Sequence, residues 1–176
     1  LETNHHINGV VFDLRGNPGG LLNEDINVAN VFLAKNIQIV ATKGKIEEWN
    51  KSFVTVNDPV DLKIPMVILA DGGSASAAEI VSGSMQDLDR AVIIGQRTFG
   101  KGLVQSTRSL PFNAKLKITT AKYYIPSGRC IQALNYAERN ADGSPVRTPD
   151  SLQVAFKTKN GRKVMDGGGI EPDIVL

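Results

Sequence analysis

The stretch "IPMVILADGGSASAAEIVSGSMQD", residues 64–87, decides the fold. Its continuous apolar run from Ile64 to Asp71 predicts a buried strand. A turn rich in glycine and serine follows, and a helix is predicted from Ala77. A strand that leads through a short turn into a helix is the repeating unit of α/β domains, so this stretch predicts that fold class.

The sequence on both sides repeats this alternation. Strands are expected at 7–15, 37–43 and 91–95. A glycine-rich turn at Gly16–Gly20 precedes a helix expected from Leu22 to Leu33, where apolar residues recur at helical spacing. Residues 44–63 show no clear pattern. The alternation over the first 95 residues predicts an α/β domain with a largely parallel sheet.

The later part of the chain predicts β structure with little helix. Strands are expected at 103–107, 114–126 and 152–158. Asn160–Gly161 is a typical hairpin turn between the last of these strands and the residues that follow. The polar segment Asn135–Asp150 contains glycine and two prolines, so we expect an exposed loop there.

Composition narrows the function classes. The 176 residues suit one domain, and 41% of them are hydrophobic, enough for a sizeable core. A net charge of +2 with both signs mixed does not favour nucleic-acid binding. Cys130 is the only cysteine, so no internal disulfide forms, and we interpret it as structural. No apolar run approaches the ~20 residues of a membrane helix, and no spacing indicates a metal or cofactor site.

Ser76 has two interpretations. With Glu79 it forms the S-x-x-E pattern of a capping box, in which the serine only caps the helix. The same serine follows a strand and a turn at the positive end of a helix, as in a nucleophile elbow, where backbone amides can hold an oxyanion. The motif is not G-x-S-x-G, so the residues alone leave both roles open.

A nucleophilic serine needs a base. The histidines, His5 and His6, are adjacent near the N-terminus, where we expect surface residues without a catalytic role. Lys101 lies between Gly100 and Gly102, which permit a close approach of the backbone. Serine–lysine pairs are known catalytic variants, and the alternative is a solvated loop lysine.

The turn "DLRGNPGG", Asp13–Gly20, could simply join a strand to a helix, or could offer its amides to an anion. It contains neither G-K-[ST] nor G-x-G-x-x-G, so a nucleotide site is not supported.

Three motifs together resemble the carboxyl-terminal processing proteases, also called tail-specific proteases. They are "DLRGNPGG", "GGSASAAEIVSGSMQD" and "GQRTFGKGLVQ", in this order, and the ending "GGGIEPDIVL" is also similar. The resemblance covers Gly9 to about Ile131 and the tail. It implies a crotonase-like, Clp-protease-like layered α/β core with a β-rich C-terminal part.

The resemblance also implies roles for particular residues. Ser76 would be the nucleophile, Lys101 the general base, and Gln105 the residue that orients the lysine. Asp87 would be a supporting residue near the site, as in some members.

An oxyanion hole would use the amide of Ala77 and one from the glycine turn, Gly19 or Gly20. The reaction would be acyl transfer through an acyl-enzyme.

The resemblance further implies that residues 1–176 are the protease core, with the PDZ domain and N-terminal region of such proteases outside this sequence. Substrates would be proteins or peptides bound by their C-terminal region, in the bacterial periplasm or cell envelope, without cofactor, metal or nucleic acid. The resemblance leaves open whether the chain forms a homo-oligomer. The alternatives are a non-catalytic peptide-binding scaffold and a crotonase-type acyl-CoA enzyme, which would need neither Ser76 nor Lys101.

Overall fold

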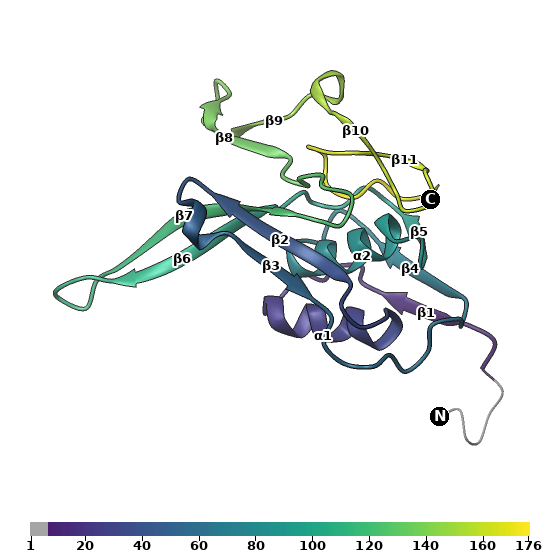
Figure 1. Cartoon of the computed structure of the whole chain (residues 1–176). Helices are drawn as coiled ribbons and strands as arrows, with labels where there is room; N and C mark the ends of the chain where they lie inside the picture. The colour runs from purple at the N-terminus through teal and green to yellow at the C-terminus, as the bar shows by residue number, and fades with distance from the viewer. Residues whose placement is uncertain (1–6) are drawn as a thin grey trace.

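The computed structural model describes residues 7–176. Its helices are α1 (Leu22–Phe32) and α2 (Ala77–Asp87), with short 3-10 helices η1 (Glu47–Trp49) and η2 (Asp150–Leu152). Its strands are β1 (Val10–Asp13), β2 (Gln38–Gly44), β3 (Lys51–Val54), β4 (Met66–Ala70), β5 (Val92–Gly95), β6 (Leu103–Ser109), β7 (Lys115–Tyr124), β8 (Leu134–Arg139), β9 (Pro145–Arg147), β10 (Ala155–Lys157), β11 (Lys163–Met165) and β12 (Ile174–Val175). Figure 1 shows their arrangement. No helix among these residues has the length and apolar character to cross a membrane.

A parallel sheet forms one layer, in the order β1-β4-β5-β12. Along β4, Met66, Ile68 and Ala70 are buried, while the residues between them are half-buried. This alternation is expected where one face of a strand packs on the core. The sheet confirms the parallel arrangement expected in the first half of the chain for β1, β4 and β5, and the C-terminal tail joins it as β12.

The second sheet is antiparallel, in the order β3-β2-β7-β6. The strand–helix alternation predicted that β2 would join the parallel sheet. That prediction is wrong, because β2 pairs antiparallel with β3 and β7. Ala41 of β2 lies opposite Tyr124 of β7, more than eighty residues later in the chain. A local apolar pattern predicts a strand but does not determine which distant strand it pairs with.

Helix α2 lies between the two sheets. All eleven of its residues are buried, and it packs against β2 and β5. The Ser84 hydroxyl donates to the Ile39 carbonyl of β2 at 2.9 Å. Apolar side chains from both layers, including Ile39, Ile68, Ile80 and Ile93, form the main core around the helix. Helix α2 is therefore held on several sides.

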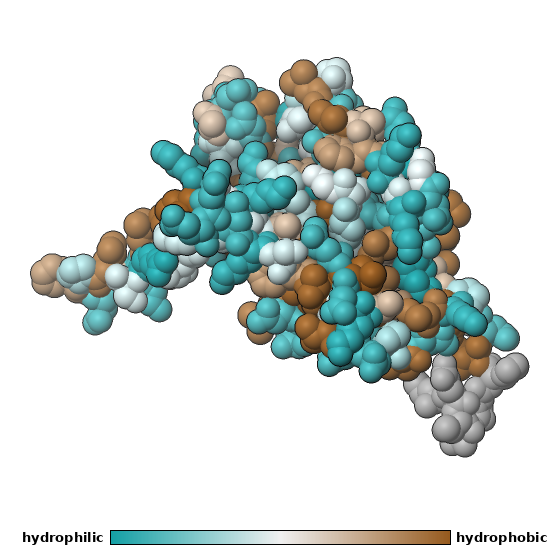
Figure 2. All heavy atoms as spheres, in the orientation of Figure 1, coloured by the Kyte–Doolittle hydropathy of each residue, from teal (hydrophilic) through white to brown (hydrophobic). Residues whose placement is uncertain are grey.

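The C-terminal half is built from hairpins. The turn at Asn160–Gly161 joins β10 and β11, as predicted. The expected loop at 135–150 is exposed, but it contains the hairpin β8–β9, whose turn uses Gly143 at φ +82°. The polar composition of this segment predicted its exposure correctly but gave no sign of its two strands. The hairpin β6–β7 projects from the body as an arm on which apolar and hydrophilic residues are mixed (Figures 1 and 2).

Candidate active site

Two turns meet beside the first turn of α2. The Asp71 carboxylate accepts hydrogen bonds from the amides of Gly16 and Gly73, each at 2.9 Å. The Ser74 hydroxyl donates to the Leu14 carbonyl at 2.7 Å. The amide bonds, first that of Gly16, lower the pKa of Asp71. These contacts fix the glycine-rich turn after β1 against the serine-rich turn after β4.

Gly19 lies directly against the backbone around Ser76. Its φ is +89°, and a Cβ there would lie 2.6 Å from the Ala75 carbonyl oxygen and 2.7 Å from the Ala77 nitrogen. A Cβ atom does not approach other atoms to within 3.0 Å, so only glycine fits. The resemblance placed this turn beside the serine, and the backbone geometry brings the two together.

The two candidate amides of the glycine turn differ in their hydrogen bonds. The Gly19 amide donates to Asn17 Oδ1 at 2.9 Å. The amides of Gly20 and Ala77 donate to no group within residues 7–176. Gly20 precedes α1 and Ala77 begins α2, and an unpaired amide at a helix start is suited to a developing oxyanion. The Gly19 amide is thus already engaged and the Gly20 amide is not, and which of the two would act with Ala77 stays a prediction.

Ser76 stands at the N-cap of α2 in an uncommon backbone conformation. Its φ is 57° and its ψ is −114°, a region that residues with a Cβ rarely occupy. Such strain persists only where the surroundings hold it, and it concentrates at functional sites. The Ser76 amide donates to Glu79 Oε2 at 2.8 Å, the reverse contact of the predicted capping box. The half-buried side chain is thus held at the positive end of the helix.

Glu79 joins Ser76 to the loop that carries Lys101. Its fully buried carboxylate accepts from the amides of Ser76 (2.8 Å), Gly100 (2.7 Å) and Lys101 (2.8 Å), and from Thr98 Oγ1 (2.5 Å). Burial raises the pKa of this carboxyl, although the four donors oppose the shift. One carboxylate side chain accepts all four bonds, and the backbones of the two predicted catalytic residues are thereby held together.

Sequence reasoning missed this role of Glu79. The spacing S-x-x-E predicted its bond to Ser76, which lies three residues away. Its bonds to Gly100 and Lys101 cross more than twenty residues, and no local pattern predicts them.

The glycines beside Lys101 permit the close approach that the sequence suggested. A Cβ at Gly100 would lie 2.3 Å from Ala133 Cβ, and a Cβ at Gly102 would lie 2.7 Å from the Gln132 nitrogen. The Lys101 residue itself is exposed. The neighbouring chain therefore packs against the loop backbone and leaves the lysine facing solvent.

Gln105 lies on β6, four residues beyond Lys101, and is also exposed. It shares one end of the arm with the lysine loop, which is compatible with the predicted orienting role.

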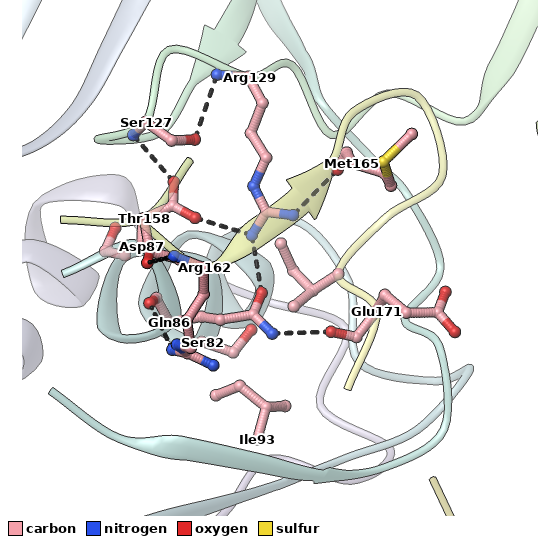
Figure 3. A network of polar contacts seen from close by, with 12 residues as sticks. Ser82, Gln86, Asp87, Ile93, Ser127, Arg129, Thr158, Arg162, Met165 and Glu171 are labelled. Atoms are coloured by element: carbon pink, nitrogen blue, oxygen red, sulfur yellow. Dashed lines mark hydrogen bonds and ion pairs between the residues drawn. The ribbon is translucent and has the colours of Figure 1, made fainter. Parts of the chain in front are cut away.

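Asp87 lies at the opposite end of α2 from Ser76, eleven residues away, which is about 16 Å along a helix. Figure 3 shows it paired with Arg129, at 2.9 Å between Oδ1 and Nη2, with both side chains fully buried. The Ser127 amide donates to its other oxygen at 2.9 Å, and Arg129 also donates to Gln86 and to the Met165 carbonyl. The structure therefore does not bring Asp87 together with Ser76, because this pair fastens the far end of the helix.

Other candidates from the sequence can be placed briefly. His5 and His6 lie outside the described residues. Burial raises the pKa of the Cys130 thiol, which makes it a poor nucleophile. Within residues 7–176, no group of three or more His, Cys, Asp or Glu side chains is arranged to hold a metal ion.

Comparisons with known proteins agree with the motifs. The model of Peptidase family S41 matches residues 1–137. The chain is 48% identical over 129 residues to the carboxy-terminal-processing protease of Bartonella bacilliformis, which covers 73% of this chain and 29% of that protein. It is 41% identical over 126 residues to the carboxyl-terminal-processing protease of Synechocystis sp., covering 72% of this chain and 29% of the relative.

A solved structure is similar over nearly the whole chain. The photosystem II D1 C-terminal processing protease matches with a TM-score of 0.69 at 26% identity, over 97% of this chain and 35% of that one. The chain thus spans about a third of the length of the proteins it matches. The similarity agrees with the layered α/β fold and with the family that the three motifs resemble.

Proposed function

Because the chain belongs to peptidase family S41, we propose that it is the catalytic core of a serine endopeptidase that cleaves proteins near their C-terminal ends. The relatives named as carboxyl-terminal processing proteases support this substrate class. The chain covers only part of each relative, so the activity of a whole protease is part of the proposal.

In this proposal Ser76 attacks the peptide carbonyl after Lys101 removes its proton, and Gln105 orients the lysine. The carbonyl carbon gains a bond to Ser76 Oγ, the oxyanion accepts from the amides of Ala77 and Gly20, and the proton passes to the leaving amine. Water then hydrolyses the acyl-enzyme. In this scheme the lysine acts as the base in its neutral form.

The single observation that carries the proposal is the fourfold bonding of the Glu79 carboxylate. It holds the amides of Ser76 and Lys101 on one side chain. A helix cap alone requires only the first of these bonds, so the second supports a joint role for the two residues. A non-catalytic scaffold would have no need to position Lys101.

The test is peptidase activity against an unstructured protein such as casein. Ser76→Ala is expected to abolish cleavage while costing roughly 0.5–2 kcal/mol of stability, as loss of a cap does. Lys101→Arg is also expected to be inactive, because guanidinium stays charged. Lys115→Arg, on the projecting arm, is the matched control and should retain activity.

Activity in Ser76→Ala would reject the nucleophile. Thioester turnover that survives both substitutions would instead support an acyl-CoA enzyme. The proposal places the protease in the bacterial periplasm or cell envelope, which fractionation of cells that express the parent protein would test.

A further inference from the structure

A cleft of about 660 Å³ is lined by two residues, Leu103 and Gln105, that closely follow the predicted catalytic lysine in the sequence. One wall is the base of the β6–β7 arm, with Leu103, Gln105 and Lys122, and the other includes Asn135 and Tyr136. Leu103 follows Lys101 by two residues, and Gln105 is the residue expected to orient it. The cleft therefore adjoins the site where a peptide would be cut.

A β-bulge in the arm builds this wall. Val104 lies opposite Ala121, but Gln105 lies opposite Thr119, so Thr120 is an extra residue in β7. Without the bulge, side chains three residues apart on one strand would point to opposite faces of the sheet. With it, Lys122 and Thr119 both line the cleft.

The cleft carries only positive charge. None of its lining residues is acidic, and Lys122 is its one charged residue. Lys122 forms no salt bridge with any of residues 7–176. Asn135 Oδ1 accepts from the Ala137 amide, so its amide group stays available as a donor. Neutral donors around an unpaired ammonium are complementary to a carboxylate.

We propose that this cleft binds a carboxylate of the peptide substrate through Lys122, supplied either by an acidic side chain or by a free C-terminus. The inference rests on the proposed peptidase function, because it assigns the cleft to that substrate. An extended peptide advances about 3.3 Å per residue. The bound carboxylate would therefore lie within a few residues of the scissile bond.

Binding can be measured without cleavage, in the Ser76→Ala chain, by the anisotropy of N-terminally labelled octapeptides of alanine, serine and leucine. One peptide is neutral with an amidated end, a second has a free C-terminus, and a third is amidated with one glutamate. The second and third distinguish the two sources of the carboxylate, and at least one should bind more tightly than the neutral peptide.

Substitutions then assign the effect to the cleft. Lys122→Gln should weaken binding of the anionic peptide about three- to tenfold and leave the neutral one unchanged. Lys117→Gln removes the same charge farther out on the same strand and should have no effect. Lys122→Glu should prefer an amidated peptide with one lysine. Circular dichroism checks that each variant is folded.

Equal binding of all three peptides, or no binding at millimolar protein, would overturn the proposal. So would equal effects of Lys117→Gln and Lys122→Gln, because they would indicate only a general attraction to the arm. Since these measurements use a chain without Ser76, they stand whether or not Ser76 is the nucleophile.

Discussion

Helices α1 and α2 both contain eleven residues and differ in almost everything else. Only Ile26, Ala29 and Asn30 of α1 are buried, whereas every residue of α2 is. Helix α1 begins after Leu21, without a side-chain cap, while α2 begins at Ser76 with Glu79 bonded back to it. One helix covers a surface of the core, and the other runs through the molecule.

The difference shows how buried polar residues organise a site. Buried polar groups need partners, and several of those on α2 obtain them from distant segments. Glu79 binds the Lys101 loop, the Gln86 amide donates to the Glu171 carbonyl, and Asp87 pairs with Arg129. The Asp25 carboxylate of α1 has a buried oxygen without a hydrogen-bond partner among the described residues, whereas Asp87 Oδ1 of α2, which also lacks one, has Arg129 as an ion-pair partner.

The largest expected effect comes from breaking the far end of α2. Arg129→Met leaves Asp87 buried and uncompensated, so the free energy of unfolding should fall by about 3–5 kcal/mol in urea titrations. Asn27→Ala, on the exposed side of α1, should change it by no more than about 0.5 kcal/mol.

Adding Asp87→Asn to Arg129→Met should recover part of the loss, because the unpaired charge is removed. If Arg129→Met and Asn27→Ala cost the same, the contrast between the helices does not reside in this ion pair.

The second effect concerns the first turns, where each helix has a glutamate. In Glu79→Gln, the new side-chain NH₂ group faces backbone amides that are also donors and cannot bond to it. The Ser76 turn and the Lys101 loop should therefore separate. Peptidase activity should fall about 100-fold, the cost of misplacing reacting groups by about 1 Å. Glu24→Gln in α1 loses only a favourable charge at the helix start, worth about 0.3–1 kcal/mol of stability, and should leave activity intact.

Assays at equal folded fraction, checked by circular dichroism, separate activity from stability. Wild-type turnover in Glu79→Gln would mean that its carboxylate does not position the two loops.

The sequence predicted the features of α2 that depend on neighbouring residues. The strand–turn–helix at 64–87 and the S-x-x-E cap are local patterns, and the structure confirms both. The family resemblance rested on three motifs in order, and the family match confirms it. The roles of Ser76, Lys101 and Gln105 stay predictions.

Contacts between distant residues could not be predicted. The partner of β2 is β7, the partner of Asp87 is Arg129, and the Lys101 loop binds Glu79. Each joins residues more than twenty positions apart, and periodicity and capping patterns contain no information at that range.

A third test sharpens the account of the α2 terminus. At Gly19 a Cβ would collide with the Ala75 carbonyl and the Ala77 amide, whereas at Gly20 nothing lies within 4 Å. Gly19→Ala should cost about 1–3 kcal/mol through backbone strain and reduce activity sharply. Gly20→Ala should retain both. Thermal melts and peptidase assays on the pair check this, and equal behaviour would contradict the close packing of the turn against Ser76.

The smallest effect belongs to α1. Burial, with a lesser contribution from the charge of Glu24, raises the pKa of Asp25 to about 6. The folded chain therefore holds this proton more tightly than the unfolded chain, and its stability falls as the pH rises from 3.8 through about 6. Asp25→Asn should stabilise the chain by about 0.5–1 kcal/mol at pH 7, since partial exposure screens the effect.

Urea titrations of wild type and Asp25→Asn at pH 4 and pH 7 measure this difference. A stabilisation of equal size at both pH values would contradict an ionised, poorly solvated Asp25.

The central claim is that Ser76 and Lys101 act together, and covalent labelling tests it most directly. The chain is treated with a fluorophosphonate that reacts with activated serines, and the adduct is located by mass spectrometry of its peptides. The account predicts one adduct, on Ser76, absent in Ser76→Ala and strongly reduced in Lys101→Met. An adduct elsewhere, or one on Ser76 that forms equally fast without Lys101, would contradict it.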